Sequence, residues 1–545
     1  MKHEQLIQHL HDRSDYMKPD RHSGTSKLLA TRGGHSLGSD LKNGTSLART
    51  TSASLIINIL LYFFLYVGQI LIIRNISREE YSIFVISISF IALLALFVDL
   101  GLTSLFMKMF SETEAESVLG ANDTRGDVLG TILLMRGVAS VLVCLFIFFI
   151  PPMMGYGPQA TFLMRILLFT IIISPRLLAF RNVGDTFILA RGKFVLSSSI
   201  ALLDSILFAG SLFLFSRTSL SLITATLVYT LCSLPGFILV WIIISKWLIK
   251  ESIRLKFSWI VMRRILKNAF PLILGTAFIT IFNNLDPILL DKWSDRSQVS
   301  SFGASLRIVT ALSVVPMVLV NIVAPEVAKR LTRISTFSVQ ELVNEVFRAL
   351  FLFSGGVALL LTTSHDFLAR TILGRGYSDA SQLFIYLGWS FIPLSFITLL
   401  AEISISSGSL WSSTIFRFTM MAVTLISDLF LIRIYGAVGS IVSRMVGLTI
   451  GCIGFCFVLK TIPSVDVNKF YYSLTRWLLC ISISVVILLL LLTLRMNELT
   501  TSGCIILIYI SLAFMTKSLT KADVKKIFSY TRKRHVPAYQ LEDIV

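Results

Sequence analysis

Apolar residues form long, nearly uninterrupted stretches along this chain, and short polar segments separate one stretch from the next. A helix needs about 20 predominantly apolar residues to cross a bilayer, and most of these stretches reach or approach that length. The strands of a β-barrel would alternate apolar and polar residues, so the pattern predicts an all-α polytopic membrane protein with about 14 transmembrane helices. The predicted spans are Ser54–Ile73, Ser82–Leu100, Val128–Ile150, Gln159–Phe180, Phe194–Phe215, Leu220–Ser245, Phe270–Leu290, Val299–Val323, Val346–Thr363, Leu383–Ser404, Leu410–Ile432, Val438–Leu459, Leu474–Leu494 and Cys504–Thr516.

The order of the spans divides the chain into two six-helix bundles, followed by one further helix pair. A short repeat supports this division, because four residues of the first half recur with the same spacing in the second. They are Arg78, Ser82, Phe84 and Ser87, matched by Arg296, Ser300, Phe302 and Ser305. Duplicated halves with the substrate site between them are a recurring transporter design. The predicted segments are a disordered cytoplasmic tail at 1–50, an N-terminal six-helix bundle at 51–248, an amphipathic linker helix at 249–267, a C-terminal six-helix bundle at 268–460, an extra helix pair at 461–516 and a basic cytoplasmic tail at 517–545.

The distribution of charged residues predicts the orientation of these spans in the membrane. The chain has 49 Lys and Arg against 31 Asp and Glu, a formal net charge of +18 that would indicate nucleic acid in a soluble protein. In a polytopic protein such an excess is typical of basic cytoplasmic loops. Lys and Arg gather after even-numbered spans, so we expect a multi-pass protein of the cell membrane with both termini cytoplasmic and no nucleic-acid partner. The heaviest run contains Glu251–Lys267, where bulky apolar and basic residues alternate, which predicts an amphipathic helix in the cytoplasmic interface.

Ionisable residues inside the predicted spans are the candidate functional groups, because a charge in lipid is costly and usually faces a partner or a water-filled cavity. Guanidinium groups bind pyrophosphate through paired hydrogen bonds. The candidate substrate ligands are Arg136, Arg165, Arg307, Arg417 and Arg444. The candidate coupling and cavity-lining polar residues are Asn283, Asn284, Asp286, Asp204 and Asp428.

The alternative for each arginine is a structural ion pair. Asp286 and Arg307 are expected at similar depth in adjacent spans, and Glu402 and Arg417 flank one tight cytoplasmic turn. Asp286 could instead titrate or bind an ion as part of transport, with H+ or Na+ as the coupling ion. Two arginines have no acid close by in the sequence and are favoured as phosphate ligands, namely Arg136 and Arg165.

Nothing in the sequence indicates an enzyme. A P-loop and a His-Glu-x-x-His zinc motif are both absent, so we expect no catalytic residue, no metal and no direct drive by ATP. The six cysteines all fall in apolar stretches, where we expect them to pack rather than to form disulfides. No cofactor is expected beyond a coupling ion.

Three stretches resemble landmark segments of the polysaccharide flippases in the multidrug/oligosaccharidyl-lipid/polysaccharide exporter superfamily. They are SREEYSIFVISISFIALLALFVDLGL from Ser77, NAFPLILGTAFITIFNNLDPILL from Asn268 and IYGAVGSIVSRMVG from Ile434. The resemblance implies two six-helix bundles around a central cavity that opens alternately to each membrane face. It also implies a polyprenyl-pyrophosphate-linked oligosaccharide as cargo. The long polar N-terminal tail departs from the short start usual in that family.

Three function classes follow from these observations. The leading hypothesis is a flippase for lipid-linked oligosaccharide, a monomer that contacts membrane lipids and works beside the polymerase and glycosyltransferases of the same pathway. The second is a multidrug or metabolite cation antiporter of the same superfamily, which should carry more acids than arginines within its spans. The third, a glycosyltransferase or polymerase, should have a large domain outside the membrane, and the short outer loops argue against it.

Overall fold

The computed structural model describes the chain between residues 37 and 518, with gaps. The described residues are 37–99, 102, 103, 106, 109, 110, 113, 124–176, 180–317, 319, 320, 337–406, 410–460, 467–493, 497–516 and 518. Most of the predicted N-terminal tail and nearly all of the C-terminal tail lie outside them. The candidate membrane spans all belong to one compact unit, which lies within Ala53–Phe528.

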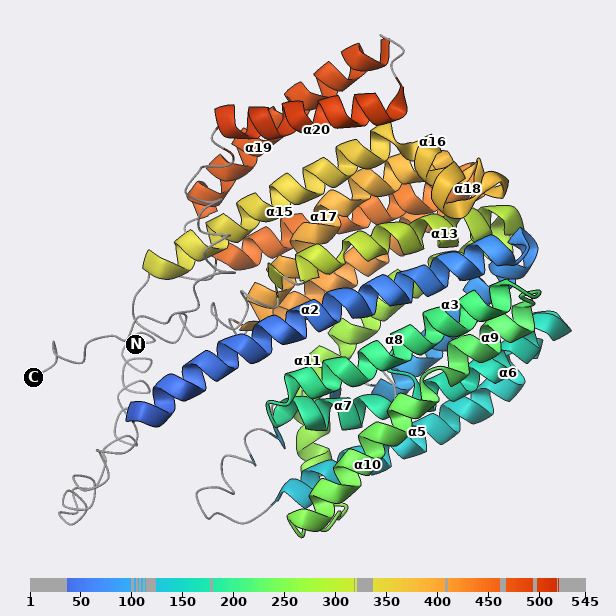
Figure 1. Cartoon of the computed structure of the whole chain (residues 1–545), viewed down its shortest axis with the longest axis vertical. Coiled ribbons are helices and arrows are strands. Elements are labelled where there is room, and N and C mark those ends of the chain that lie inside the picture. The colour runs from blue at the N-terminus through green and yellow to red at the C-terminus, as the bar shows by residue number, and fades with distance from the viewer. Residues whose placement is uncertain are drawn as a thin grey trace, which may run out of the picture. The chain divides into compact units, whose positions relative to one another are not determined.

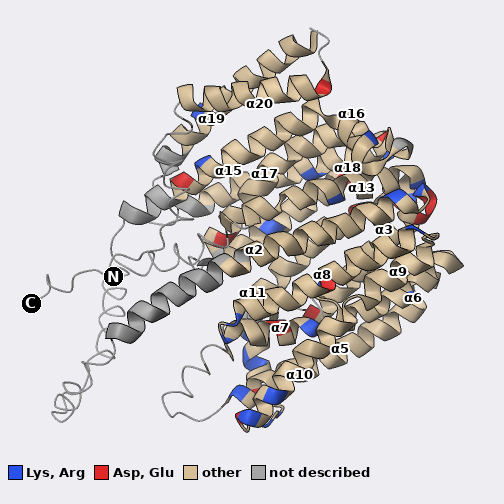
Figure 2. Ribbon diagram, viewed as in Figure 1, with Lys and Arg blue, Asp and Glu red and all other residues tan. Residues whose placement is uncertain are grey.

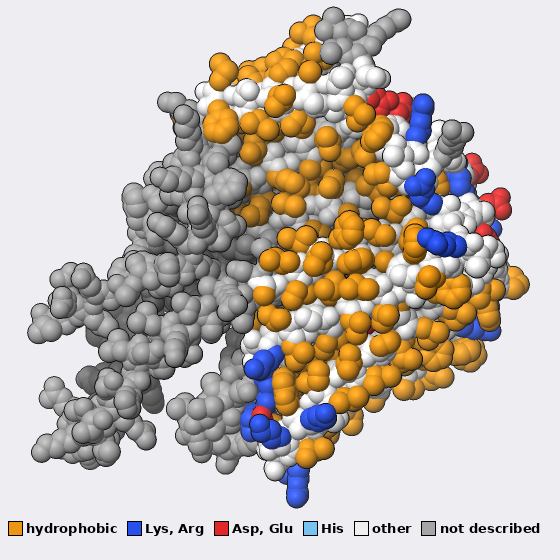
Figure 3. All heavy atoms as spheres, in the orientation of Figure 1, with side chains coloured by type: hydrophobic (Ala, Val, Ile, Leu, Met, Phe, Trp, Pro, Cys, Tyr) orange, Lys and Arg blue, Asp and Glu red, His pale blue; other side chains and the backbone are white. Residues whose placement is uncertain are grey.

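The regular secondary structure of the described residues is entirely helical, with no β-strand, which confirms the all-α prediction (Figure 1). The charged positions lie mostly toward helix ends (Figure 2), and apolar side chains cover much of the visible surface (Figure 3). This distribution is that of a multi-pass membrane protein. The helices are α2 (Leu37–Asn75), α3 (Arg78–Asp99), α5 (Arg125–Met153), α6 (Pro158–Ile173), α7 (Arg181–Ala190), α8 (Phe194–Ser216), α9 (Leu222–Leu231), α10 (Leu234–Lys250), α11 (Trp259–Asn284), α12 (Asp286–Trp293), α13 (Arg296–Leu312), α15 (Phe337–Thr363), α16 (His365–Leu368), α17 (Ala380–Ser406), α18 (Leu410–Lys460), α19 (Val467–Thr493) and α20 (Glu498–Met515), with a π-turn at Ala369–Leu373 and a 3-10 turn at Arg375–Tyr377.

Eleven helices among the described residues are long and apolar enough to cross a membrane, or twelve if the bent helix α11 counts as one span. The predicted count of about 14 is therefore not confirmed. One difference is α18, which has 51 residues and contains two predicted spans. Its limbs meet at Gly436, whose φ of 55° lies in the left-handed region that favours glycine. Another difference is α6, which has 16 residues and falls below the length of a full span.

Two segment predictions are wrong in part. Helix α2 begins at Leu37, so residues 37–50 are helical rather than a disordered tail. The linker is not one helix, because residues 252–258 are non-helical and α11 begins only at Trp259. Its first part, Trp259–Lys267, is bent by 61° from Phe270–Asn284. Ser258 caps this helix by accepting a hydrogen bond from the Val261 backbone N–H, which fixes where it starts.

The internal repeat lies where the two halves meet. Helices α3 and α13 begin at the two repeat arginines, Arg78 and Arg296, and they pack against each other. The four repeat serines on these helices are fully buried: Ser82, Ser87, Ser300 and Ser305. Small hydroxyl side chains let two helices approach closely in a membrane, so the repeat marks the contact between the halves.

The last two helices form a pair, α19 and α20, that packs on α15. Trp477 of α19 donates hydrogen bonds to the Phe351 carbonyl and to the Tyr509 hydroxyl of α20, at 3.0 Å and 2.9 Å. Tyr509 donates in turn to the same Phe351 carbonyl at 3.1 Å. Because these groups are buried, the three bonds fix the pair on the C-terminal half.

Candidate functional site

The C-terminal half contains a buried charge cluster at a helix break. Asp286 begins α12 immediately after α11 ends, and it is 1% exposed. Arg444, from the second limb of α18, donates to the Asp286 carboxylate at 2.8 Å and to the Phe282 carbonyl at 2.9 Å. Its other terminal nitrogen lies 3.3 Å from the Asn283 side-chain oxygen. The ion-pair partner of Asp286 is thus Arg444, so the predicted pairing of Asp286 with Arg307 is wrong.

A second carboxyl group joins this cluster. Asp428, on the first limb of α18, is 1% exposed and lies next to Asp286, Ser443 and Arg444. Its Oδ1 atom has no hydrogen-bond partner among the described residues. Two carboxylates and one guanidinium leave one negative charge in excess. A proton or another monovalent cation would restore neutrality in this buried place.

Arg307 has the opposite imbalance. It lies half-buried on α13, and its charge acts on the hydroxyl groups of Tyr66 in α2 and Tyr81 in α3, both in the N-terminal half. Within the described part of the chain, Arg307 makes no hydrogen bond or ion pair. It is therefore a cation at the meeting of the two halves that no carboxylate of the described residues balances.

The remaining predicted arginines lie in three different settings. Arg136 is buried and donates to Asp99 and to Thr103, the latter at 2.7 Å, so it has an acid partner in the fold although none is close by in the sequence. Arg165 is exposed, and its guanidinium lies over the Phe148 ring at 5.1 Å. Arg417 lies beside Glu402, the neighbour that the sequence predicts.

Two further predicted residues take no part in the C-terminal cluster. Asn284 donates to the Thr280 carbonyl of its own helix at 2.9 Å. Asp204 lies on α8 in the N-terminal half, where it belongs to a separate buried charge cluster. Of the predicted coupling and polar residues, the structure therefore brings together Asn283, Asp286 and Asp428.

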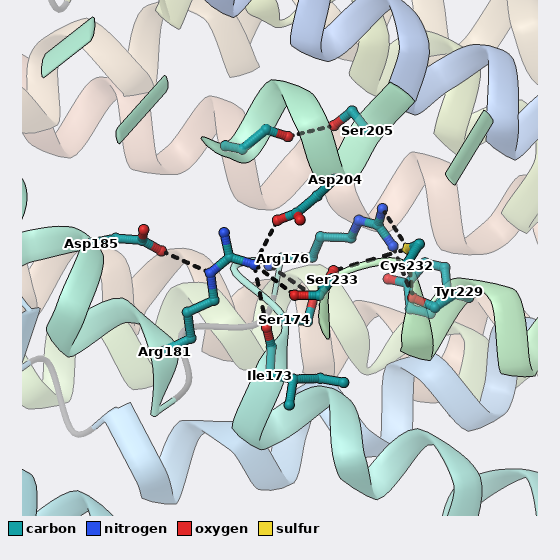
Figure 4. Close-up of polar contacts among 11 residues, drawn as sticks. Ile173, Ser174, Arg176, Arg181, Asp185, Asp204, Ser205, Tyr229, Cys232 and Ser233 are labelled. Carbon is teal, nitrogen blue, oxygen red and sulfur yellow. Dashed lines mark hydrogen bonds and ion pairs between the residues drawn. The ribbon is translucent and has the colours of Figure 1, made fainter. Parts of the chain in front are cut away.

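The cluster around Asp204 contains two arginines that the sequence analysis did not select (Figure 4). Arg181, which is fully buried, donates to Asp204 at 2.5 Å, and its Nε lies 3.4 Å from Asp185. Arg176 lies over the rings of Phe208 and Tyr229, with its charge also near Asp204. Two cations and two carboxylates balance here, in contrast to the C-terminal cluster.

These arginines occupy two helix breaks. One break follows α6, which ends at Ile173, and the other lies between α9 and α10 and includes Ser233, whose carbonyl also accepts a hydrogen bond from the Phe237 backbone N–H at 3.0 Å. Arg181 donates to the Ser233 carbonyl at 3.1 Å and approaches the Ile173 carbonyl at 3.4 Å, while Arg176 donates to the Tyr229 carbonyl at 3.0 Å. In lipid, freed backbone groups need such partners, so the cluster holds two discontinuous helices together.

The sequence signal for this cluster was a proline in each break. Pro175 follows the end of α6, and Pro235 lies in the first turn of α10. Arg181 was assigned to a loop because it follows the predicted end of a span at Phe180. Arg176, which follows Pro175 inside an apolar run, is the residue from which the cluster could have been predicted.

The two halves are also joined at one end of the helices. Arg78, at the start of α3, donates to the Ser301 hydroxyl of α13 at 2.7 Å and to the Gly376 carbonyl at 2.8 Å. It also forms an ion pair with Asp379 at 2.6 Å. Lys292 of α12 donates to the Met154 carbonyl at 2.9 Å, which adds a second link between the halves.

Solved structures of known transporters share this fold. "Lipid II flippase MurJ, inward closed conformation" superposes with a TM-score of 0.65 at 16% identity, covering 86% of this chain and 99% of that chain. The MATE multidrug transporter DinF-BH gives 0.57 at 18% identity, covering 76% and 95%. An inward-facing multidrug resistance MATE family transporter of the MOP superfamily gives 0.57 at 14% identity, covering 75% and 96%. At these sequence identities, the structural similarity establishes a shared fold and no more.

A comparison with protein families gives the identity more directly. The family described as polysaccharide biosynthesis protein matches residues 47–329, just over half of the 545 residues. Among proteins of curated function, none matches this sequence. The matched region runs from α2 through α13, and so includes the helix breaks of the N-terminal half, Asp286 and Arg307. This multi-pass membrane protein therefore belongs to the polysaccharide biosynthesis protein family.

Proposed function

We propose that the protein is a flippase that moves a polyprenyl-pyrophosphate-linked oligosaccharide across the cell membrane, by alternating access coupled to an ion. The observation that carries the proposal is the uneven charge balance of its buried groups. Arg136, Arg181 and Arg417 each have a carboxylate beside them. Arg307 has none among the described residues, and it faces the other half.

An unbalanced guanidinium in a membrane favours an anionic ligand, and pyrophosphate accepts paired hydrogen bonds from it. The position of Arg307 supports its role as the phosphate ligand, because a group between two moving halves can bind cargo from either side. Tyr66 and Tyr81, the neighbours of Arg307 on the N-terminal half, offer hydroxyl groups for the sugar or phosphate oxygens.

The coupling ion in this proposal is H+, bound by Asp286 and Asp428. Arg444 already donates to Asp286 at 2.8 Å, so its positive charge opposes the binding of a metal cation at the same oxygens. A metal cation also requires several oxygen ligands around it, whereas a proton does not and can be shared by two adjacent carboxyl groups. Na+ is the alternative coupling ion, and in that case an imposed sodium gradient would drive transport.

The proposed orientation has both termini in the cytoplasm, which places Arg78 and Asp379 at the outer end. Their contacts then close the outer side, as expected for a protein ready to accept cargo from the cytoplasm. The partners in this proposal are the lipid-linked oligosaccharide, the surrounding lipids, and the polymerase and glycosyltransferases of the pathway. We propose that the protein acts as a monomer.

Arg307→Ala and Arg307→Lys test the phosphate ligand. In proteoliposomes that contain a fluorescent lipid-linked oligosaccharide, we expect Arg307→Ala to reduce translocation by about 100-fold, since a charge-assisted bidentate contact contributes about 3 kcal/mol. Arg307→Lys should retain part of the rate, because the charge remains while the paired geometry is lost. Arg217→Ala is the matched control, an exposed arginine that is not among the candidate substrate ligands. Equal rates for Arg307→Ala and the control would exclude Arg307 as the ligand.

The second candidate function is efflux of an organic cation, and the negative excess at Asp286 and Asp428 is the observation that favours it. In that case the carboxylates would bind the substrate itself, and Arg307→Ala would leave transport unchanged.

A further inference from the structure

The segment that joins the two halves forms an exposed basic surface, which we name the linker face and define as residues 246–267. Seven of its Lys and Arg side chains are exposed and have no ion pair among the described residues: Lys246, Lys250, Arg254, Lys256, Arg263, Arg264 and Lys267. Lys and Arg also gather near the ends of α5 and α10 in Figure 2. Basic cytoplasmic loops are common in membrane proteins, so charge alone identifies no partner.

Large apolar side chains alternate with these basic residues and are exposed as well. Trp259 is 65% exposed and Ile260 is 73% exposed, and Leu255, Phe257 and Leu266 are also exposed. Such side chains in water would be unfavourable, and Trp is enriched where membrane meets water. The helix segment Trp259–Lys267 turns 61° away from the span that follows it, so it does not continue along the axis of that span. The geometry is that of a helix lying in the interface.

The linker face is held in place by the N-terminal half. Glu251 forms ion pairs with Arg125 of α5 and with Arg191 at the end of α7, the first at 2.9 Å. The extended chain that follows lies directly on α5, since a Cβ added at Gly126 would collide with the Arg254 carbonyl oxygen. The Lys256 backbone N–H donates to the Gly126 carbonyl at 3.3 Å. The basic side chains are therefore presented from a fixed backbone.

We propose that the linker face binds the headgroups of anionic phospholipids in the leaflet beside it. Charge complementarity carries this choice of partner, because seven unpaired cations next to exposed aromatic and aliphatic side chains match a negatively charged lipid surface. An acidic soluble protein would match the cations, but it would not cover apolar side chains at the level of the membrane. The inference does not depend on the cargo of the transporter.

A consequence for transport follows from the position of the linker face. It is bonded to α5 and α7 of the N-terminal half through Glu251, and it continues directly into α11 of the C-terminal half. Lipid bound there fixes the connection about which the halves move. Anionic lipid should therefore change the rate of transport without entering the substrate site.

Trp259 provides a local test. The full-length protein is reconstituted in nanodiscs with a lipid whose acyl chain carries pyrene, and energy transfer from Trp259 is obtained as the difference between the wild type and Trp259→Phe. We expect this difference to be larger with pyrene-phosphatidylglycerol than with pyrene-phosphatidylcholine, with a local enrichment of about tenfold. The preference should weaken at high salt, because salt screens charges at the surface.

A variant that lacks five of the seven basic side chains completes the test. Replacement of Arg254, Lys256, Arg263, Arg264 and Lys267 by Gln should abolish the preference. A control variant, with Gln at three exposed arginines elsewhere, should keep it: Arg217, Arg296 and Arg370. Equal transfer from both lipids in the wild type, or a preference that survives in the five-glutamine variant or at high salt, would overturn the proposal. If the variant does not fold, the salt dependence of the lipid preference in the wild type still tests the proposal.

Discussion

Two members of the C-terminal charge cluster, Asp428 and Arg444, should respond differently to substitution. Asp428→Asn leaves the 2.8 Å ion pair between Arg444 and Asp286 intact and removes the unbalanced negative charge. Arg444→Met leaves two buried carboxyl groups beside each other with no cation. The first change should therefore preserve the fold, whereas the second should destabilise it.

The magnitudes follow from burial. Removal of one partner from a buried ion pair costs about 3–5 kcal/mol, because the other charge stays desolvated and unpaired. Arg444 is 6% exposed and Asp286 1%, so Arg444→Met belongs in this range. Asp428→Asn keeps the shape of the side chain and leaves a neutral cluster, so it should cost at most about 1 kcal/mol, the size of an ordinary point substitution.

Two assays measure the difference. Unfolding of each variant in detergent gives the change in stability, and transport in proteoliposomes under an imposed pH gradient gives the coupling. We expect Asp428→Asn to unfold close to the wild type and to lose the response to the gradient. If Asp428→Asn were as unstable as Arg444→Met, the cluster would not carry the one excess negative charge that we infer. If it kept the full response, Asp428 would not be the proton site.

Three further predictions concern other parts of the molecule. Gly236→Ala should destabilise the N-terminal half by about 2 kcal/mol, because the added Cβ would collide with the Asp204 carboxylate, and the unfolding midpoint checks this. Asp379→Asn should weaken the contact of Arg78 that the proposed orientation places at the outer end, so a cysteine introduced near that end should be labelled faster; an unchanged rate would show that this contact does not close the outer side. The Arg191 hydrogen bond, with a contribution from Arg125, holds the pKa of Glu251 below its ordinary value. The stability that Glu251 contributes is therefore present above its unfolded pKa and is lost as pH falls through the lower folded pKa, and Glu251→Gln should lose that part of the acid dependence in unfolding experiments.

Much of the fold could be predicted from the sequence, because a bilayer requires every span to be a long apolar run. The same rule predicts the two limbs of α18, although no polar loop separates them. At Gly436 the chain turns within α18, and the two predicted spans lie on either side of the turn. The linker differs from its prediction. Its alternation of apolar and basic residues suits an interfacial helix, but Lys256 donates a backbone hydrogen bond to Gly126 instead of continuing a helix.

The candidate site was less predictable, because ion pairs join residues that are distant in the sequence. Arg136 pairs with Asp99 from another helix, a partner that a search among sequence neighbours does not reach. Arg444 and Arg307 were both selected, but depth along the spans does not determine which of them faces Asp286. The rotation of each helix about its axis decides this, and packing against several neighbours sets that rotation.

The nature of the cargo is the central claim, and one measurement tests it most directly. Proteoliposomes of the purified wild type are given, in parallel, a polyprenyl-pyrophosphate-linked oligosaccharide and a fluorescent organic cation, each under the same pH gradient. We predict translocation of the lipid-linked oligosaccharide and no efflux of the cation. Efflux of the cation without movement of the lipid-linked sugar would contradict the flippase assignment and would favour an antiporter that binds its substrate at Asp286 and Asp428.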